Sequence, residues 1–480
     1  MNTIIPEQHF SRVEHVHFVG IGGIGMSGIA EVMHNLGYKV HGSDIAENAN
    51  TRRLRDLGID IKIGHKAENV VNAQILVTSS AIKNANIEIE EARRRFIPVI
   101  PRPKMLAELM RLKSSIAIAG THGKTTTTSM VATLIDAVGL DPTIINGGII
   151  NAYNTNGRLG AGEWMVVEAD ESDGSLASLH ATIAVVTNID PEHLDYYGDF
   201  EALRAAFASF VQNIPFYGTA ILCIDHPEVQ SLVGQLRDRR LITYGFSQQA
   251  DVQARCVGES DDGRPPHEVL IRDRQSDKCK SLGIFKPPMI GAHNVSNALA
   301  AVAVARQLGI KGGLILETLA TFSGVRRRFT LTGTWKGINI HDDYAHHPVE
   351  IKATLEAARD VCKGKLIAIV QPHRYTRLQE LWDAFLFCFD DADVVVVMPV
   401  YAAGEEPING CDNVGFVAAL SERGHRNAIA INTPDDIAPF VARTGEPGDM
   451  VVVLGAGNST TWANELPRQL SALQPGSAHA

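Results

Sequence analysis

The 480-residue sequence lacks several features that mark other classes of protein. No run approaches the roughly eighteen uncharged apolar residues that a membrane-spanning helix needs. The first twelve residues lack the apolar core of a signal peptide. The six cysteines form no C-x-x-C pair, which argues against a disulfide framework or a zinc site. We therefore expect a cytoplasmic protein with no membrane partner.

A basic excess is also missing, because the formal net charge is −10. This balance argues against a nucleic-acid partner, although a few local donors could still bind phosphate. Hydrophobic residues make up 45% of the chain and charged residues 20%, as in globular proteins with sizeable cores. The composition leaves the oligomeric state open between monomer and homodimer.

A recurring pattern of short apolar strand, glycine-bearing turn and amphipathic helix fills most of the sequence. This pattern predicts an α/β fold with parallel sheets, arranged as three consecutive domains. We place the domains at residues 1–112, 113–325 and 326–480. The first and last are expected to be Rossmann-like and the central one a P-loop-type ATPase domain. The linkers near Lys113 and Arg326 are candidate hinges.

Individual elements can be predicted from the same pattern. Helices are expected at 26–36, 105–112 and 294–308, a hairpin loop at 259–267 and a frayed tail at 474–480. The expected strands are 15–19, 39–41, 75–77, 97–100, 115–119, 165–168, 183–187, 366–370, 394–397, 428–431 and 450–454.

The first glycine-rich loop fits the pattern G-x-G-x-x-G directly after a strand. Its glycines are Gly20, Gly22, Gly23 and Gly25, and Asp44 follows the next strand, where an acid meets a ribose in dinucleotide folds. Such a loop lets the backbone approach a pyrophosphate at a helix N-terminus. The diphosphate could belong to NAD or to a UDP-sugar, and a turn that only serves packing is the structural alternative.

A second loop lies between a predicted strand and helix and contains a G-K-T core. Its residues are Gly120, Thr121, His122, Gly123, Lys124, Thr125 and Thr126. Backbone amides of such a loop hold phosphates, the lysine neutralises their charge, and the threonine hydroxyl can bind Mg²⁺. Ile118 stands where a full Walker A motif has glycine. An ATP loop beside a diphosphate loop disfavours a dehydrogenase and favours phosphoryl transfer to a nucleotide-linked substrate.

The second loop and six further motifs together resemble the Mur ligase family over nearly the full chain. The motifs are GIGGIGMSG at 20–28, EADESD at 168–173, TNIDPEH at 187–193, GAHNVSN at 291–297, DDYAHHP at 342–348 and QPHRYTR at 371–377. The resemblance implies an ATP-dependent ligase of peptidoglycan synthesis. It would join an amino acid, expected to be L-alanine, to the carboxylate of UDP-N-acetylmuramate through an acyl phosphate.

The resemblance also implies roles for single residues. Thr125, Glu168 and His193 would bind Mg²⁺, although imidazole is a softer donor than this ion prefers. Asn188 would contact the UDP-sugar or metal-bound water. The nucleotide would be bound by His293, Asn294, Asn297, Arg328 and Asp343. Which of the three arginines at 326–328 approaches the nucleotide is left open, and Asn294 could instead only cap a helix.

The third domain is expected to bind the amino acid. Tyr344 and His346 would face it, and His346 could accept a proton from the attacking amine. Arg374 and Arg377, with His373 beside them, follow a predicted strand and could hold a carboxylate in a bidentate way. Exposed arginines at the start of a helix are the alternative.

Three other functions are compatible with parts of this pattern. A related ligase that attaches a preformed peptide to the same UDP-sugar would share much of the last-domain motif. A non-catalytic nucleotide-binding regulator would keep both loops, but the intact Lys124, Thr125 and Glu168 argue against it. An NAD-dependent oxidoreductase would leave the second loop unexplained. A ligase for diaminopimelate is disfavoured because no Asp-Asn-Pro-Arg motif occurs.

Overall fold

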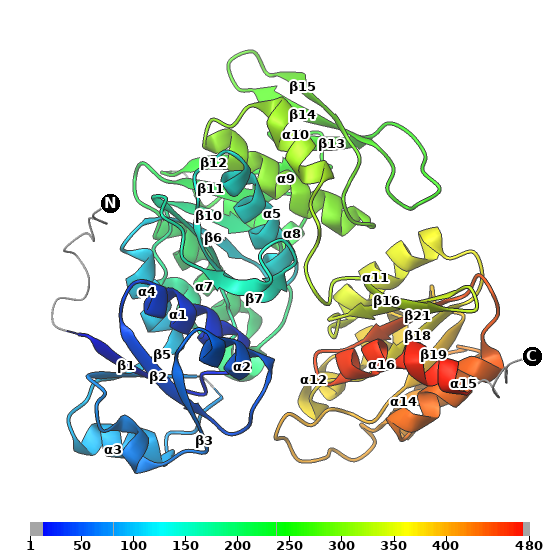
Figure 1. Ribbon diagram of the computed structural model, residues 1–480. Coiled ribbons are helices and arrows are strands. Elements are labelled where there is room, and N and C mark those ends of the chain that lie inside the picture. The colour runs from blue at the N-terminus through cyan, green and yellow to red at the C-terminus, as the bar shows by residue number, and fades with distance from the viewer. Residues whose placement is uncertain (1–12, 80, 237, 474–480) are drawn as a thin grey trace, which may run out of the picture. The chain divides into compact units, whose positions relative to one another are not determined.

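The computed structural model describes residues 13–79, 81–236 and 238–473 (Figure 1). The N-terminal segment and the tail expected to fray therefore lie outside the described residues. Three sheets organise the chain, with helices packed on their faces, so the fold is α/β throughout. By its contacts the chain divides into two compact units, of which one holds the first two sheets and the other the third.

The first sheet is parallel, with the strand order β3-β2-β1-β4-β5. This order reverses direction beside β1, and in open parallel sheets ligands bind outside the carboxyl ends of strands at such a point. The strands are β1 (His15–Val19), β2 (Lys39–Asp44), β3 (Asp60–Ile63), β4 (Ile75–Thr78) and β5 (Val99–Pro101). The helices are α1 (Ile24–Asn35), α2 (Ala49–Asp56), the 3₁₀ helix η1 (Ala67–Val70), α3 (Ile87–Arg94) and α4 (Arg102–Met110).

The second sheet has ten strands in the order β15-β14-β13-β12-β11-β10-β6-β9-β7-β8. Its strands are β6 (Ser114–Ala119), β7 (Thr143–Ile150), β8 (Thr155–Arg158), β9 (Trp164–Glu168), β10 (Ile183–Val186), β11 (Thr219–Cys223), β12 (Arg240–Gly245), β13 (Val252–Cys256), β14 (His267–Asp273) and β15 (Lys278–Phe285). Its helices are α5 (Lys124–Ala137), η2 (Ser175–Ser178), α6 (Leu194–Tyr197), α7 (Phe200–Gln212), α8 (Pro227–Val233), α9 (Ala292–Gln307) and α10 (Gly312–Ala320). The central strands are parallel and fully buried, whereas the edge strands pair in antiparallel fashion.

The third sheet has the order β16-β17-β21-β18-β19-β20. Its strands are β16 (Thr330–Trp335), β17 (Ile338–Asp343), β18 (Leu366–Val370), β19 (Val394–Val397), β20 (Ala428–Ala430) and β21 (Met450–Leu454). Its helices are α11 (Pro348–Val361), α12 (Tyr375–Glu380), α13 (Trp382–Phe387), α14 (Asn413–Glu422), η3 (Pro434–Asp436), α15 (Ile437–Thr444) and α16 (Ser459–Ala472). Val451 and Val452 enter two different core clusters, because successive strand residues face opposite sides of a sheet.

Most sequence-predicted elements are confirmed, with shifts at their ends. The predicted helix 105–112 begins earlier, at Arg102, because Pro103 fits the first turn of a helix. The loop 259–267 joins the antiparallel strands β13 and β14, as expected of a hairpin. The strands β3, β7, β8 and β11–β17 were not predicted. None of the helices in the described ranges is long and apolar enough to cross a membrane.

Candidate active site

The glycine loop between β1 and α1 is held by the end of β2. The backbone amides of Gly20 and Ile21 both donate to the carbonyl of Ser43, and Gly20 takes a φ of +79° that favours glycine. The Asp44 carboxylate accepts a hydrogen bond from the amide of Gly22 at 2.8 Å. The predicted acid therefore touches the predicted loop, where it fixes the backbone; contact with a ribose remains a prediction.

A positively charged side chain lies where this loop enters α1. A Cβ atom added to Gly25 would come within 3.0 Å of Nη1 of Arg102, the first residue of α4. The same guanidinium donates at 3.0 Å to both Asp170 and Asp173, which follow β9. Helix N-terminus and guanidinium together favour an anion at this point. Sequence reasoning missed Arg102, because its partners are far away along the chain.

The second glycine loop packs tightly against the segment after β10. Gly120 has a φ of +136°, and a Cβ there would lie 2.0 Å from Oγ1 of Thr187. Asn188 accepts from the backbone amide of His122 at 2.7 Å and donates to the His122 carbonyl at 3.0 Å. Thr121 accepts at 2.8 Å from the amide of Asp190. The predicted loop residues and Asn188 thus come together, with Asn188 engaged on the loop.

The loop ends in a left-handed glycine that starts α5. Gly123 has a φ of +82°, and a Cβ on it would lie 2.5 Å from Oδ1 of Asn297 in α9. Thr127 donates to the same oxygen at 3.1 Å. The predicted nucleotide-binding residue Asn297 therefore lies against the second glycine loop. Thr125 and Thr126 in the first turn of α5 are both buried.

Lys124 lies among carboxylates at the carboxyl end of the sheet. Its Nζ donates to the Gly120 and Thr121 carbonyls and, at 2.8 Å, to Glu171, which is 1% exposed. Burial opposes the lysine charge, but Glu171, Asp170 and Glu168 together raise the pKa of Lys124 above its ordinary value. Lys124 is therefore charged at neutral pH and is available to neutralise phosphate once it leaves its present partners.

Candidate metal ligands surround this lysine. Glu168 ends β9 and accepts from the backbone amide of Gly147 at 2.7 Å. His193 lies with Glu171 and Glu192, and one ligand atom from each falls within 4.8 Å of the others. These atoms are the carboxylate oxygens and imidazole nitrogens that divalent cations bind. The sequence prediction included His193 but neither glutamate, although both belong to the motifs in which Glu168 and His193 were recognised.

The C-terminal unit contains a second group of predicted residues. Asp343 accepts backbone hydrogen bonds from Phe329 and Ala345, each at 2.7 Å. Burial raises its pKa to about 6, while Arg328 acts against this rise. The guanidinium carbons of Arg327 and Arg328 lie 4.6 and 5.4 Å from the centre of the Tyr344 ring. Arg327 also donates to the Gly455 carbonyl at 2.7 Å.

The aromatic residues of this unit form a cluster. The ring of His346 lies 5.1 Å from that of Tyr344 and 5.9 Å from that of His373. Burial, together with His346 and Arg377, lowers the pKa of His373 to about 4, so its ring is neutral. Arg377 lies 3.2 Å from Nδ1 of His373. The predicted amino-acid-binding residues Tyr344, His346 and Arg377 are thus brought together.

Arg374 departs from its neighbours, because it binds a carboxylate of the chain itself. Its Nε donates to Glu405, which also accepts from the backbone amide and hydroxyl of Thr376. Sequence reasoning missed Glu405, which lies in a loop without any motif. Arg374 has a φ of +71°, so the turn before α12 is set by an unusual backbone. The arrangement assigns Arg374 a structural contact; a substrate contact remains a prediction.

Two of the remaining predicted nucleotide ligands, His293 and Asn294, lie in the first turn of α9. Residues 289–294 cluster with the C-terminal unit. Asn294 donates to the Ile290 carbonyl at 2.8 Å and lies 3.0 Å from Nε2 of His293. Burial and the nearby Arg328 lower the pKa of His293 to about 4. His293, Asn294 and Arg328 therefore belong to one neighbourhood, as predicted nucleotide ligands should.

Comparison with known proteins gives three family-model matches that follow one another along the chain. They are the Mur ligase family catalytic domain at residues 15–114, the Mur ligase middle domain at 118–305, and the Mur ligase glutamate ligase domain at 327–457. A UDP-N-acetylmuramate–L-alanine ligase of Parvibaculum lavamentivorans is 59% identical over 96% of this chain and 94% of its own.

Solved structures agree with the sequence comparison. The crystal structure of a UDP-N-acetylmuramate-alanine ligase from Thermotoga maritima is 28% identical, has a TM-score of 0.79, and is matched over 96% of this chain and 100% of its own. A murein peptide ligase from Psychrobacter arcticus shares the fold, with a TM-score of 0.71 and 24% identity, over 96% of this chain and 100% of its own.

Proposed function

The chain belongs to the Mur ligase family, and we propose that it joins L-alanine to the lactyl carboxylate of UDP-N-acetylmuramate at the expense of ATP. The observation that carries this proposal is the 59% identity, over 96% of the chain, to a relative named for that reaction. The product would be a precursor of peptidoglycan. The two glycine-rich loops and the aromatic cluster of the third domain would supply the binding chemistry that three substrates need.

Phosphoryl transfer activates the carboxylate, which is otherwise a poor electrophile. The carboxylate attacks the γ-phosphorus of ATP, and ADP leaves, giving an acyl phosphate; the amine then attacks the acyl carbon and phosphate leaves. Both reactants in the first step are anions, so a positive charge must lie between them. Lys124 is the residue for this role, because its carbonyl and Glu171 contacts can be exchanged for phosphate oxygens.

The residues around Lys124 also suit Mg²⁺, the cation expected for the family. The hydroxyl of Thr125 and the carboxylate of Glu168 would hold one ion, and His193 with Glu171 and Glu192 would hold a second. Their mostly hard oxygen donors fit the ion, with imidazole as the softer exception. Bound Mg²⁺ would supply positive charge to the phosphate oxygens of ATP.

The amine must attack as a neutral base, and His346 is the candidate to take its proton. Nδ1 of His346 lies 2.9 Å from the Tyr344 carbonyl, which accepts only, so a neutral ring carries its lone pair on Nε2. Arg377, beside the neutral His373, is the candidate to hold the amino-acid carboxylate. The first loop, with Arg102, would hold the diphosphate of the UDP-sugar.

Phosphate release from ATP by the purified full-length protein tests the proposal. Release should require both UDP-N-acetylmuramate and L-alanine, and it should fall by three orders of magnitude or more, roughly, in Lys124→Ala, because a phosphate-neutralising charge is lost from the transition state. Lys39→Ala, which removes an exposed lysine from β2, is the matched control and should keep full activity. Release without the UDP-sugar would contradict the proposed reaction.

The amine supplied decides between this reaction and peptide recycling. L-alanine, glycine and the stem tripeptide are to be compared at equal concentration with the same UDP-sugar. Release with the tripeptide alone would assign the chain to the recycling reaction instead. We also propose a cytoplasmic location, since ATP and UDP-sugars are cytoplasmic substrates.

A further inference from the structure

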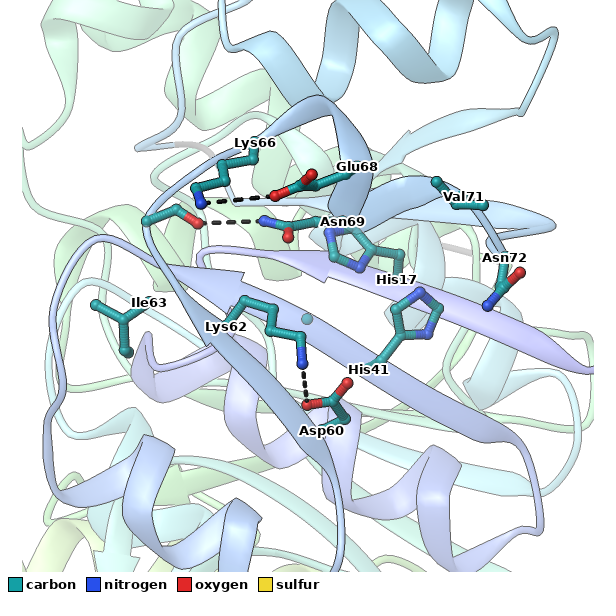
Figure 2. Close-up of a pocket in the computed structure, with 12 residues that line it drawn as sticks. His17, His41, Asp60, Lys62, Ile63, Lys66, Glu68, Asn69, Val71 and Asn72 are labelled. Carbon is teal, nitrogen blue, oxygen red and sulfur yellow. Dashed lines mark hydrogen bonds and ion pairs between the residues drawn. The ribbon is translucent and has the colours of Figure 1, made fainter.

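A row of polar side chains crosses one face of the first sheet, away from the glycine loop. His17 of β1, His41 of β2 and Asp60 of β3 are direct partners in the parallel register of these strands. Residues in register point to the same face of a sheet. All three line a cavity of about 390 Å³ beneath η1, and Figure 2 shows the two imidazole rings side by side in it.

The hydrogen-bond partner of His17 determines which of its nitrogens carries a proton. Its side chain is 1% exposed, and Nε2 lies 3.3 Å from Oε2 of Glu88. The same carboxylate accepts hydrogen bonds from Ser43 at 2.6 Å, from Asn69 at 2.5 Å and from the backbone amide of Lys66 at 3.2 Å. A carboxylate only accepts, so Nε2 of His17 donates. In the neutral ring the lone pair is then on Nδ1, which is buried and has no hydrogen-bond partner among the residues that the structure describes.

His41 offers a second lone pair to the same cavity. Its Nε2 is also buried, and within residues 13–79, 81–236 and 238–473 it has no hydrogen-bond partner. The centre of its ring lies 4.8 Å from that of His17. In a neutral imidazole, one ring nitrogen carries a lone pair that can bind a metal ion.

We infer that His17 and His41 form the preorganised half of a binding site for a divalent transition-metal ion of the Zn²⁺ class. Imidazole nitrogens suit Zn²⁺, Co²⁺ and Ni²⁺ better than Mg²⁺. A carboxylate bound to the far nitrogen of a ligand histidine, as Glu88 is to His17, is the usual support of such a ligand. The site is separate from the residues proposed for the ligase reaction.

Asp60 is the third ligand of this site. Its carboxylate is paired with Lys62 at 3.0 Å, and the two side chains are 66% and 57% exposed. An exposed ion pair of this kind contributes little to stability, so the Asp60 carboxylate can leave it at little cost in free energy. Asp60 and His41 are neighbours in register, and rotation of the aspartate side chain would direct it toward the imidazole nitrogens. Water from the open cavity would complete the coordination.

Titration of the full-length protein with Co²⁺ in excess Mg²⁺ tests the site, because Co²⁺ reports its ligands by visible absorption. Wild-type protein should bind one equivalent of Co²⁺, and added Zn²⁺ should displace it. Binding should weaken by about 100-fold or more in His41→Ala and by about tenfold in Asp60→Asn, following the loss of a direct ligand. Both variants should keep wild-type phosphate release, which also shows that they fold.

Two matched variants separate this site from other metal-binding groups. His180→Ala removes an exposed histidine, and His193→Ala changes the ligase centre. Both variants should still bind one equivalent of Co²⁺. The signal should lack the near-ultraviolet band of a cobalt thiolate, which binding at the cysteines would give. Unchanged Co²⁺ affinity in His41→Ala, loss of the equivalent in His193→Ala, or a thiolate band would each overturn the inference.

Discussion

Asn188 uses both ends of its amide on the backbone of His122, and this gives it a role in shaping the phosphate loop. Asn188→Ala should raise the KM for ATP about tenfold, because two partly buried hydrogen bonds are worth about 1–2 kcal/mol. The KM for the UDP-sugar should change little. Steady-state kinetics with each substrate varied in turn checks the prediction.

Asn188→Asp is the matched comparison, since it keeps the shape and the acceptor for the His122 amide but loses the donor to the His122 carbonyl. Its KM for ATP should lie at or above that of the alanine variant, because a carboxylate oxygen would face a carbonyl oxygen. A rise confined to the KM for the UDP-sugar would instead favour direct contact between Asn188 and the sugar.

Among the elements, the N-terminal turn of α3 ties the first sheet to its glycine loop. Glu88, fully buried, accepts from Ser43 at 2.6 Å, from Asn69 at 2.5 Å and from the backbone amide of Lys66 at 3.2 Å. Ser43 in turn accepts the two amides that begin the glycine loop. One carboxylate thus links α3, η1 and β2 to the loop.

The lowered pKa of Glu88 predicts how this link depends on pH. The folded pKa of about 2 lies below the ordinary 4.5, so the charge stabilises the fold above pH 4.5 and this contribution is lost as pH falls toward 2. The shift corresponds to about 3 kcal/mol. The free energy of unfolding in urea should be larger for wild-type protein than for Glu88→Gln. This difference should be constant above pH 5 and should narrow below pH 4.5.

Glu91 on the same helix is the control for burial. Hydrogen bonds from Arg94 and Arg95 lower its pKa to about 2 as well, but these partners lie at the surface. Salt screens surface charges and affects buried ones much less. The loss of unfolding free energy in Glu91→Gln should vanish in high salt, while the loss in Glu88→Gln should persist. Equal salt dependence of the two variants would contradict the argument.

At the scale of the whole molecule, Arg102 fastens the first sheet to the second. Its side chain is 13% exposed, and its partner Asp173 12%. Arg102→Ala should lower the free energy of unfolding by about 2 kcal/mol or more, because two carboxylates lose their cation in a partly dry setting. It should also raise the KM for the UDP-sugar. Arg111→Ala, which breaks an exposed pair, should change unfolding by about 0–0.5 kcal/mol.

These contacts bear on the hinge expected near Lys113. Lys113 donates to the carbonyls of Gly160 and Gly162 at 2.6 and 2.7 Å, and Arg53 donates to Thr155 and Asn156. The first two sheets accordingly form one compact unit. Rotation at Lys113 would have to break these contacts, and the hinge expected there remains a prediction. The domain boundaries themselves remain a prediction.

The sequence predicts features that depend on neighbouring residues, and it does not predict roles that depend on residues far away along the chain. The buried parallel strand Ile183–Val186 is a continuous apolar run, and Gly120 and Gly123 mark a turn locally, so both were found. The equally buried strand Thr219–Cys223 was missed. The short strand Thr155–Arg158 has no apolar pattern, because it lies at a sheet edge beside α1. Arg102 and Glu192 acquire roles only through partners that folding brings to them.

Helix α1 is in contact with strand β8 of the second sheet, which joins the first domain of this unit to the second. A Cβ atom on Gly157 would lie 2.5 Å from Cα of Gly28, so the helix that follows the first glycine loop lies backbone to backbone on the second sheet. Two reactants bound to such a frame meet at a high effective molarity, because no translational freedom is left to lose. Formation of the acyl phosphate would then be nearly unimolecular in character. Only the incoming amine would still have to be captured from dilute solution.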